Sequence, residues 1–391
     1  MLTTKLTRWK GRDAARMTNG LIELIAMMDG GHLAEFRFHE NSGLPALNLF
    51  WDAPWMSAEL GPRPAEELAQ TAGFTGHGLC FEYFGAPSGK QAAMGSPPHG
   101  EAASLRWNAR PQAGLDRTGC RWEVRLPRAQ LLFERTIQLQ NQETVVYVEE
   151  IASNEKDADH ACHWVQHATF SPPFLNAVDS SFAASGARGV TAPAEYEGGT
   201  LLSADQEFLW PDAPASERNG STVDLRIPFS AKGRGCLAAV QLDPRRDVEF
   251  IVAMNWKLGV GVGYCFRRKD FPWMAIWEEN CARPDKPWNG TTQARGMEFG
   301  TTPLPLGLEE TFRRGELFDT PTWCVIPALG KRVVRYLLFA FKIPAHIHSI
   351  ENVEVVDSHI VFHEESTASS FSIAAHGSHE FLSETDRLIA T

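Results

Sequence analysis

The stretch Leu131–Ile151 (LLFERTIQLQNQETVVYVEEI) contains two apolar runs separated by a short polar segment. The first run covers Leu131–Leu139, the turn-like Asn141-Gln142-Glu143 follows, and the second run, Thr144–Ile151, is rich in valine and tyrosine. Short runs of this kind, bounded by turn residues, are typical of β-strands. The stretch therefore predicts two consecutive strands joined by a tight turn.

The same pattern continues along the chain, and long helical periodicity is almost absent. Further strands are expected at Ala161–Phe170, Glu249–Asn255, Gly259–Phe266, Trp273–Trp277, Gln293–Thr301, Thr322–Ile326 and Val333–Ile343. Strand after strand with short turns predicts an all-β fold, a large antiparallel β-sandwich, in a single domain over residues 1–391. Pro64–Thr71 is expected to form one short helix, residues 86–100 a long loop, and the chain after about residue 374 a loosely attached tail.

Composition restricts the partners and the compartment. The 391 residues carry a net charge of −11 with no sustained basic run, which argues against nucleic acid and anionic membranes. No segment is apolar over the ~20 residues that a membrane-spanning helix needs. The seven cysteines are scattered without a CxxC pair, and the start, Met1–Met17, has no apolar signal segment. We therefore expect reduced thiols and a cytoplasmic protein.

The segment Gly296-Met297-Glu298-Phe299-Gly300 is the first candidate for chemistry. In a strand, Gly296, Glu298 and Gly300 share one face, so a lone carboxylate is flanked by two residues without side chains. Glycine in a strand often marks the close approach of a ligand, which suits a general base that must contact a substrate. The alternative is a charged residue on a solvated strand between two bends.

Two other segments supply imidazole groups. Pro97-Pro98-His99-Gly100 ends the long loop, and His163 and His167 share one face of the strand expected at 161–170. Two imidazoles and one carboxylate suffice for proton transfer at neutral pH. The alternatives are a turn-capping His99, a hydrogen-bonded core His167, or a zinc site made of His99, His163 and His167. No close paired-ligand spacing supports zinc, so no metal is expected.

Flat aromatic rings suit the C–H face of a sugar, and the chain contains 12 tryptophans. Trp277 lies close to the segments above, and Trp288 in Pro287-Trp288-Asn289-Gly290 is the best candidate for an exposed ring. Each tryptophan is individually more often a core residue than a ligand platform.

Other charged side chains near these segments are possible substrate contacts. Glu278 and Glu279 follow Trp277 directly and compete with Glu298 for the role of base. Four arginines are candidates for contact with an anionic group, with surface charge as the alternative for each: Arg283, Arg295, Arg313 and Arg314.

The order of these segments resembles the galactose mutarotase-like superfamily, which includes the aldose 1-epimerases, over roughly residues 20–345. His99-Gly100 followed by Trp107 is similar to the loop that carries one active-site histidine in that superfamily. Gln166-His167-Ala168-Thr169-Phe170 is similar to the strand that carries the second.

The third element of the resemblance surrounds the glutamate base of the superfamily. Phe271-Pro272-Trp273, Ile276-Trp277 and Gly296-Met297-Glu298 occur in the matching order, with Phe299 where proline is usual. Ala86, however, occupies the position where epimerases usually carry an arginine, and the insertion at 278–292 is long. These two departures set this chain apart as a distant branch.

The resemblance implies a supersandwich fold and an isomerase that interconverts the anomers of an aldose or modified aldose, without a cofactor. It implies Glu298 as the base at the anomeric hydroxyl, His167 as the acid at the ring oxygen, and His99 as a hydrogen-bond partner of the sugar. Two other functions remain open on the same fold. One is carbohydrate binding without catalysis, and the other is an epimerase or lyase acting on sugar phosphates.

Overall fold

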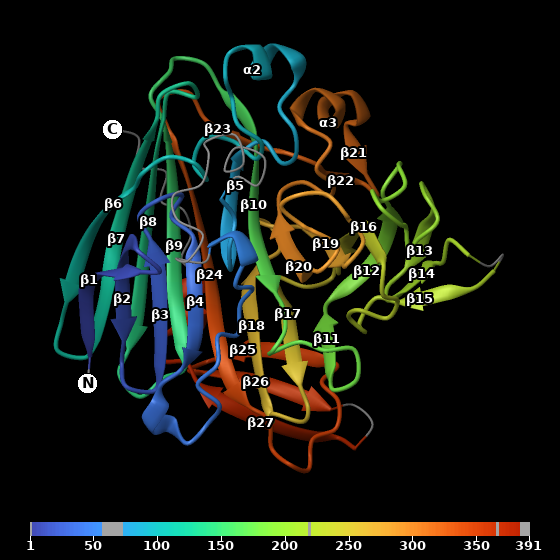
Figure 1. The fold of residues 1–391 in the computed structure, drawn as a ribbon. Coiled ribbons are helices and arrows are strands. Elements are labelled where there is room, and N and C mark those ends of the chain that lie inside the picture. Colours follow the sequence, from blue (N-terminus) through green and yellow to red (C-terminus); the bar gives the residue numbers. More distant parts are fainter. Residues whose placement is uncertain (1, 57–72, 218–219, 365–366, 384–391) are drawn as a thin grey trace.

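Two large antiparallel sheets lie face to face in the computed structural model, which describes residues 2–56, 73–217, 220–364 and 367–383 (Figure 1). Within these residues the first sheet has 14 strands and the second has 8. Every named strand pair is antiparallel, so the predicted all-β sandwich is confirmed.

The first sheet carries the candidate site in its centre, where β10 and β20 are neighbours. In spatial order its strands are β1 (Thr3–Trp9), β2 (Arg12–Thr18), β3 (Ile22–Met27), β4 (Leu33–Phe38), β5 (His77–Glu82), β10 (His160–Phe170), β20 (Gln293–Gly300), β19 (Trp273–Asn280), β16 (Arg234–Leu242), β12 (Gly186–Thr191), β13 (Glu207–Leu209), β14 (Asp212–Pro214) and β15 (Thr222–Asp224). The short β23 (Cys324–Ile326) pairs with the first residues of β10.

The second sheet backs the first. Its strands, in spatial order, are β11 (Ser180–Ala184), β17 (Val248–Asn255), β18 (Val260–Arg267), β24 (Lys331–Lys342), β9 (Val145–Asn154), β8 (Leu131–Gln140), β7 (Arg117–Leu126) and β6 (Asn108–Ala113).

Small elements complete the described chain. They are the β21–β22 pair (Glu316–Leu317, Thr320–Pro321), the C-terminal sheet β25–β27 (Asn352–Val356, His359–Glu364, Ser369–Ala374), the helices α2 (Gly89–Ala93), α3 (Leu308–Arg314) and α4 (Ser378–Ser383), and the 3-10 turns η1 (Glu40–Ser42) and η2 (Pro54–Met56). None of the described helices is long and apolar enough to cross a membrane.

The strands expected from the sequence are present, with small displacements of their ends. For example, the expected strand at 144–151 is β9, which extends to Asn154. The helix expected at Pro64–Thr71 lies outside the described residues. The expectation of a loose tail after residue 374 is wrong as far as residue 383, because α4 buries Leu382 to 1% exposure.

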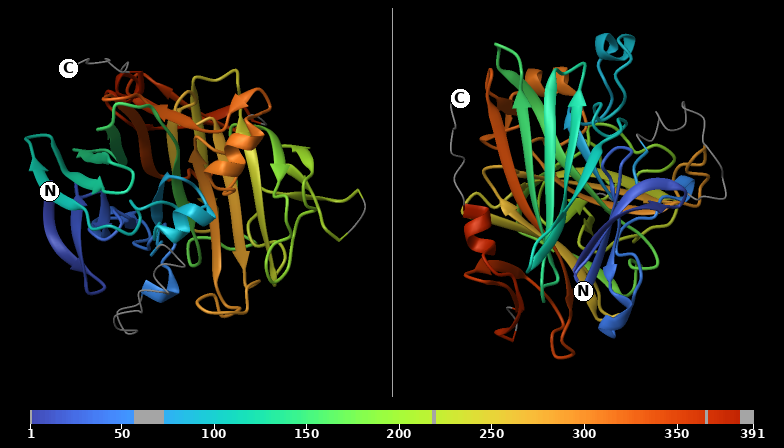
Figure 2. Two further views of the ribbon diagram at one scale, coloured as in Figure 1. Left: turned by 90° about the horizontal axis from the view of Figure 1, so that it is seen from above. Right: turned by 90° about the vertical axis from the view of Figure 1, so that its left-hand side faces the viewer.

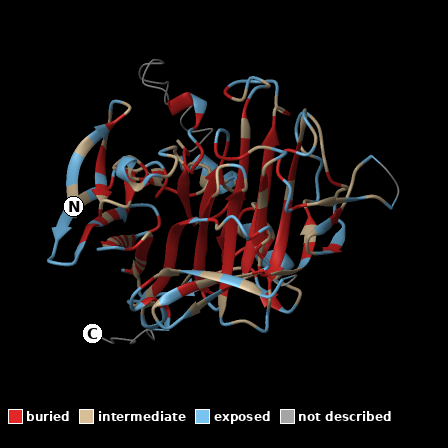
Figure 3. Cartoon of the chain, turned by 90° about the horizontal axis from the view of Figure 1, so that it is seen from below, coloured by how far each residue is buried: buried red, intermediate tan, exposed pale blue. Residues whose placement is uncertain are grey.

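Three hydrophobic clusters separate the layers. The largest fills the space between the two sheets, a second lies on the outer face of the first sheet, and the third lies between the second sheet and the C-terminal segment β25–α4. The two further views show this C-terminal segment, in red, at one side of the molecule (Figure 2). The central strands are buried along almost their whole length (Figure 3).

Strand alternation explains why β8 and β10 differ in composition. In β8 every second residue is buried and the others are half-buried, which is typical of a sheet with one face on the core. In β10 nine consecutive residues from Cys162 to Phe170 are buried, because both faces are covered. The face of Trp164 and Ala168 meets the inter-sheet core, and the face of Val165 meets the outer cluster.

A polar network crosses the inter-sheet core directly behind β10. Arg135 of β8 donates from Nε to Glu150 of β9 at 2.6 Å, and Glu150 accepts from Trp164 Nε1 at 2.9 Å and Gln166 Nε2 at 2.5 Å. Gln166 Oε1 in turn accepts from His77 Nε2 at 2.9 Å. The network therefore fixes β10 to both β9 and β5.

His77 extends this network to a third strand of the second sheet. Its Nδ1 lies 3.0 Å from the hydroxyl of Tyr264 on β18. Because Nε2 donates to Gln166, Nδ1 is the acceptor and the ring is neutral. Burial, with a contribution from Arg135, lowers the pKa of His77 to about 3, which agrees with a neutral imidazole. Every member thus has a partner, which is the condition for a stabilising buried network.

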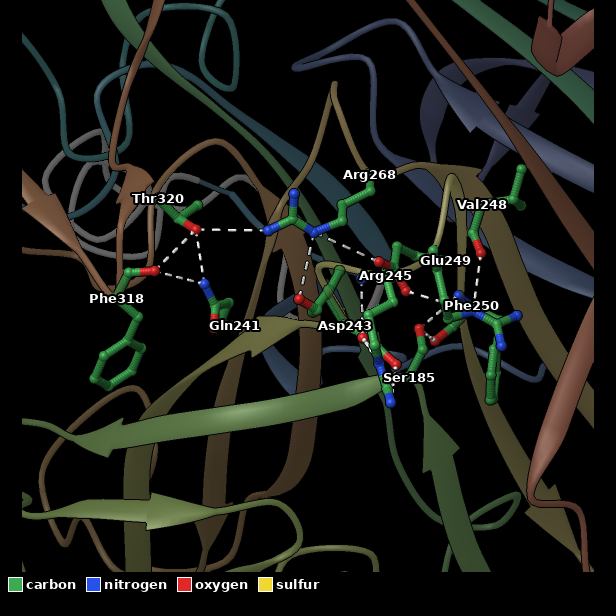
Figure 4. A network of polar contacts seen from close by, with 12 residues as sticks. Ser185, Gln241, Asp243, Arg245, Val248, Glu249, Phe250, Arg268, Phe318 and Thr320 are labelled. Carbon is green, nitrogen blue, oxygen red and sulfur yellow. Dashed lines mark hydrogen bonds and ion pairs between the residues drawn. The ribbon is translucent and has the colours of Figure 1, made fainter.

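A second polar network lies at the junction of β16, β17 and the β21–β22 turn (Figure 4). The Arg268 guanidinium lies 3.5 Å from Thr320 Oγ1, 3.4 Å from the Leu242 carbonyl and 3.8 Å from the buried Glu249. Burial raises the pKa of Glu249 to about 8 despite these neighbours. This junction links β16 of the first sheet to β17 of the second sheet, away from the candidate site.

We predict that Glu150→Gln lowers the free energy of unfolding by ~3–5 kcal/mol, because it leaves the Arg135 guanidinium buried without its counter-charge. Urea denaturation followed by tryptophan fluorescence measures the change. The control is Glu155→Gln, whose partner Arg125 is exposed, and it should stay close to wild type. An unfolding free energy for Glu150→Gln equal to that of the control would contradict the structural role of the network.

Candidate active site

A cavity of about 660 Å³ opens on the outer face of the first sheet. The central strands β10, β19 and β20 contribute residues to it, and further residues come from the segments at 84–99, 191–203 and 283–288. Its lining includes six residues that the sequence analysis had named: His99, His167, Trp277, Arg283, Trp288 and Glu298. Three of them are the predicted catalytic residues, which come from segments far apart in the sequence.

Strand register places His167 opposite Glu298. The pairs Val165↔Gly300 and Thr169↔Gly296 flank this position on β10 and β20. Both side chains therefore point to the same face, and His167 Nε2 lies 3.3 Å from Glu298 Oε1. Their side chains are 10% and 1% exposed, so the pair lies at the bottom of the cavity, almost shielded from solvent.

The hydrogen bonds of His167 indicate how its protons are arranged. Its Nδ1 lies 2.9 Å from Thr169 Oγ1, and that hydroxyl donates to the His167 carbonyl at 3.4 Å. Thr169 Oγ1 therefore accepts a hydrogen bond from Nδ1–H, which leaves Nε2 as the acceptor in a neutral ring. A hydrogen bond to Glu298 then requires one further proton, shared between Nε2 and the carboxylate. The two groups form a dyad that titrates as a unit.

Burial determines the charge of this dyad. It raises the pKa of Glu298 well above its usual value. It also lowers the pKa of His167 well below its usual value, with a smaller contribution from His99. Both shifts disfavour a net charge on the pair, so the state with one shared proton is stabilised. Glu298 Oε2 is buried with no hydrogen-bond partner among the described residues.

His99 approaches the dyad from the loop at 84–99. Its backbone is left-handed, with φ of 63°, and its Nδ1 accepts from the Gly85 N–H at 3.3 Å and lies 3.3 Å from Cys80 Sγ. Nε2 therefore carries the ring proton. Burial lowers the pKa of His99 to about 4. His99 is thus a neutral hydrogen-bond donor whose ring centre lies 6.1 Å from that of His167.

Phe74 holds both imidazoles in place. Its ring stacks on His167, with centroids 4.7 Å apart and planes 19° apart, and meets His99 edge-on at 5.2 Å. A Cβ at Gly78 would lie 2.1 Å from the Phe74 ring, so glycine at 78 is needed for this packing. The phenyl ring also excludes water from the dyad.

The glycines beside Glu298 serve packing and not the approach of a ligand, which corrects the interpretation from the sequence. A Cβ at Gly296 would lie 2.6 Å from Glu298 Oε1, so this glycine makes room for the carboxylate itself. A Cβ at Gly300 would lie 2.6 Å from Val165 and 2.7 Å from the Trp164 carbonyl, so this one permits close contact with β10.

Aromatic rings continue from the dyad along the cavity. Trp277 lies 5.9 Å from the His167 ring and 5.7 Å from Trp288. Trp288 is half-buried, and the Arg283 guanidinium lies 4.2 Å from its ring centre. Trp277 and Trp288 therefore both line the cavity, although neither is fully exposed.

Side-chain alternation removes Glu278 and Arg295 from the cavity. Both point toward the inter-sheet core, where Arg295 Nη1 lies 2.9 Å from Glu278 Oε2 and each side chain is 1% exposed. Glu278 also accepts from the Phe229 N–H at 2.9 Å. The expectation that these two residues contact substrate is therefore not met by the geometry.

Glu279 and His163 lie on the same face of the sheet as the dyad, but they contact residues that form the walls of the cavity. Glu279, fully buried, accepts from the Tyr196 hydroxyl at 3.1 Å and lies 3.1 Å from Arg283 Nε. His163 Nδ1 accepts from the Phe84 N–H at 3.0 Å. Neither residue lines the cavity, so both hold neighbouring wall residues in place. Glu298 is the carboxylate that lies beside the histidines.

Among the described residues, no group of three or more His, Cys, Asp or Glu side chains has the arrangement of a metal site. All seven cysteines are free thiols. The zinc alternative of His99, His163 and His167 has no geometric support, because His163 faces Phe84 and lies outside the lining.

The lining residues that sequence analysis missed include the aromatic side chains of Trp51, Trp55, Phe74 and Tyr196. It also weighed Arg283 as surface charge. These side chains reach the cavity through tertiary contacts of loops, and no local periodicity marks them. The spacing Trp51-x-x-x-Trp55, within a tryptophan-rich segment, was the only available signal.

Comparison with solved structures identifies the fold. A galactose mutarotase-like protein from Clostridium acetobutylicum aligns at TM-score 0.61 and 11% identity, over 88% of this chain and 99% of the other. A proposed aldose 1-epimerase from Klebsiella pneumoniae aligns at 0.59 and 13% identity, over 88% and 83%. A galactose mutarotase related enzyme from Lactobacillus acidophilus aligns at 0.54 and 12% identity, over 86% and 100%.

The chain has the galactose mutarotase-like fold. No protein-family model matches the sequence, and comparison with curated protein sequences gives no match. The resemblance inferred from the sequence is thus confirmed for a distant mutarotase-like branch at the level of fold, while the chemistry has to be argued from the site.

We predict that His99 stays neutral, as the Nε2–H tautomer, between pH 8 and pH 5, because burial lowers its pKa to about 4. Nitrogen-15 NMR of the imidazole distinguishes the tautomers and follows protonation. A His99 ring that titrates near the ordinary histidine pKa of about 6.5 would contradict its buried position in this site. A ring protonated on Nδ1 would contradict the hydrogen bond from Gly85.

Proposed function

We propose that this protein is an aldose 1-epimerase that interconverts the anomers of an aldose or modified aldose by general acid–base catalysis. The observation that carries the proposal is the 3.3 Å contact between His167 Nε2 and Glu298 Oε1 in a cavity that His99 also lines. Similarity to mutarotase-like structures supports the fold of such an enzyme.

The dyad carries one proton, so one of its two groups can donate a proton while the other accepts one. In its imidazolium–carboxylate form, Glu298 accepts the proton of the anomeric hydroxyl while His167 donates a proton to the ring oxygen. The bond between C1 and the ring oxygen breaks, and an open-chain aldehyde forms. After this step Glu298 is protonated and His167 is neutral, which is the other form of the same dyad. Rotation about C1–C2 and reversal of the proton transfers give the opposite anomer.

His99 would orient the sugar. Its Nε2–H is a neutral donor beside the dyad and suits an oxygen of the substrate, including the aldehyde oxygen of the open chain. Phe74 holds the rings of both histidines, so the donors and acceptors are positioned before the substrate arrives. No metal or organic cofactor is part of this mechanism.

A carbohydrate-binding protein without catalysis is the second candidate, favoured by Ala86, which lines the cavity where the resemblance expects an arginine. The buried dyad disfavours it, because binding alone does not require an acid and a base in contact. We place the protein in the cytosol, a proposal supported by its seven free thiols.

Glu298→Gln should abolish the base while preserving shape. We predict that the rate of anomer exchange falls by ~10²–10⁴-fold and that sugar affinity is retained. Magnetisation-transfer NMR measures the exchange, and calorimetry measures the affinity.

Glu278→Gln is the matched control, since Glu278 lies on the neighbouring strand but points away from the cavity. It should reduce stability, through Arg295, and leave the exchange rate per folded molecule near wild type. If Glu298→Gln exchanges sugar at the wild-type rate, Glu298 is not the base. If the wild type binds sugars without accelerating exchange, the protein is a binding protein.

The pH dependence follows from the dyad. Burial disfavours both the doubly protonated and the fully deprotonated pair, so the active one-proton state persists on both sides of neutrality. Activity should fall in acid, where His99 with its pKa of about 4 becomes protonated and His167 and Glu298 carry two protons. The profile of kcat/KM should therefore lack a step near pH 6.5, the ordinary pKa of histidine. A clear inflection there would show that an exposed histidine controls the rate.

A further inference from the structure

The cavity is larger than the catalytic residues require, and its two parts differ in chemistry. His99, His167 and Glu298 gather at one part, and the rings of Trp277 and Trp288 continue away from His167 in two successive contacts of 5.9 and 5.7 Å. The volume of about 660 Å³ lies within the ~300–1,000 Å³ of pockets that enclose drug-sized ligands. A single sugar ring at the dyad would leave the aromatic part of the cavity unfilled.

The polar atoms of the aromatic part are largely bonded to one another. Trp277 Nε1 donates to the Tyr196 hydroxyl at 2.7 Å, and that hydroxyl donates to Glu279 at 3.1 Å. This part therefore offers ring surface and few groups for the many hydroxyls of a reacting sugar. Ring surface suits the C–H face of a second sugar ring.

Arg283 is held rigidly in this part. Its Nη2 donates to the Tyr196 hydroxyl, its Nε lies 3.1 Å from Glu279 Oε2, and its guanidinium lies 4.2 Å from the Trp288 ring centre. Glu279 is fully buried, so it compensates the arginine charge at close range. Among the described residues Nη1 has no hydrogen-bond partner, and it can donate to a neutral hydroxyl.

The charges around the cavity disfavour an anionic substrate. Arg283 is the only lysine or arginine among the described lining residues, and Glu279 already neutralises it. His99 has a lowered pKa, and His167 shares one proton with Glu298 in a dyad of zero net charge, so neither histidine adds net positive charge near neutral pH. Glu195 and Glu197 are exposed members of the lining. A phosphate or carboxylate would meet no unpaired cation here, whereas recognition of such groups uses clustered charge-assisted donors.

We propose that the substrate is a neutral reducing disaccharide. Its reducing ring lies at His99, His167 and Glu298, and its second ring packs on Trp288 and Trp277 with a hydroxyl bound to Arg283. Because anomer exchange needs a free C1 hydroxyl, the second sugar is attached through another hydroxyl of the reducing ring. This assignment of substrate class rests on the proposed epimerase function, and it excludes the sugar phosphates.

The test compares wild-type anomer exchange on glucose, glucose 6-phosphate, maltose, isomaltose, cellobiose and lactose, with calorimetry on the same sugars. At least one disaccharide should have a KM about tenfold below that of glucose, as expected for the stacking of one additional ring. Equal KM values for glucose and every disaccharide would overturn the proposal, and so would glucose 6-phosphate as the best substrate.

The variant Trp288→Ala isolates the second subsite. It should raise KM for the preferred disaccharide about tenfold with kcat unchanged, and leave the KM for glucose within about twofold. The control is Trp323→Ala, which removes a half-buried tryptophan that packs on Phe312 outside this cavity. If Trp288→Ala changes both sugars equally, Trp288 supports the fold of the site and does not bind a second ring.

The two proposals fail in different ways. Exchange on glucose without a preference for any disaccharide overturns the subsite alone. Absence of exchange on every sugar overturns the epimerase function, and calorimetry then decides the subsite. Tighter binding of a disaccharide than of glucose would support the proposed second subsite. Equal binding of both sugars, or no binding, would overturn it. The wild-type panel gives these outcomes even if Trp288→Ala does not fold.

Discussion

The buried ion pair between Arg135 and Glu150 is the constraint on which the arrangement of the site depends. It lies between the two sheets, and Glu150 accepts hydrogen bonds from Trp164 and Gln166 of β10. A charge pair in a sandwich core is stabilising only when all of its hydrogen-bonding groups are satisfied. Here the neutral His77 completes the chain to Tyr264, so three strands of the second sheet hold two strands of the first. Slippage of β10 by one residue would break the bonds from Trp164 and Gln166 to Glu150 and the bond between His77 and Gln166.

The same constraint sets the chemistry on the opposite face of β10. Because side chains alternate, fixing Gln166 toward the core fixes His167 toward the cavity. The register with β20 then brings Glu298 to the one position where its carboxylate meets Nε2 at 3.3 Å, in the space that Gly296 leaves. Dense packing by Phe74 and the tryptophans removes water, and this burial shifts the two pKa values in opposite directions. Register therefore determines geometry, and burial determines the protonation of the dyad.

Local pattern was sufficient to predict the strands, because strand length and turn residues are encoded within a few neighbours. It also found His99, His167 and Glu298, since their segments carry motifs that resemble a known superfamily. Local pattern alone left Glu278 and Glu279 as competitors of Glu298 for the role of base. That distinction depends on which face of a fully buried strand points to the cavity, and a strand buried on both faces has no polar alternation to show it. Arg283 was not distinguished from three other candidate arginines for a related reason. A charged residue in a polar insertion has the composition of a surface loop until Glu279 and Trp288 are seen beside it.

The dyad also provides the strongest argument for an enzyme over a binding protein. Glu298 Oε2 is buried without a hydrogen-bond partner among the described residues, and a buried polar group in this state is destabilising. A binding site could avoid the larger cost of burying an ionisable group by using an amide or a hydroxyl at the same position. What those groups cannot provide is a proton that moves between two partners without a change in net charge. In the proposed epimerase reaction, ring opening and ring closure require that movement, because each step converts one form of the dyad into the other. The dyad would therefore keep zero net charge throughout the proposed cycle, which is consistent with a neutral substrate and with the absence of an unpaired cation among the described lining residues of the cavity.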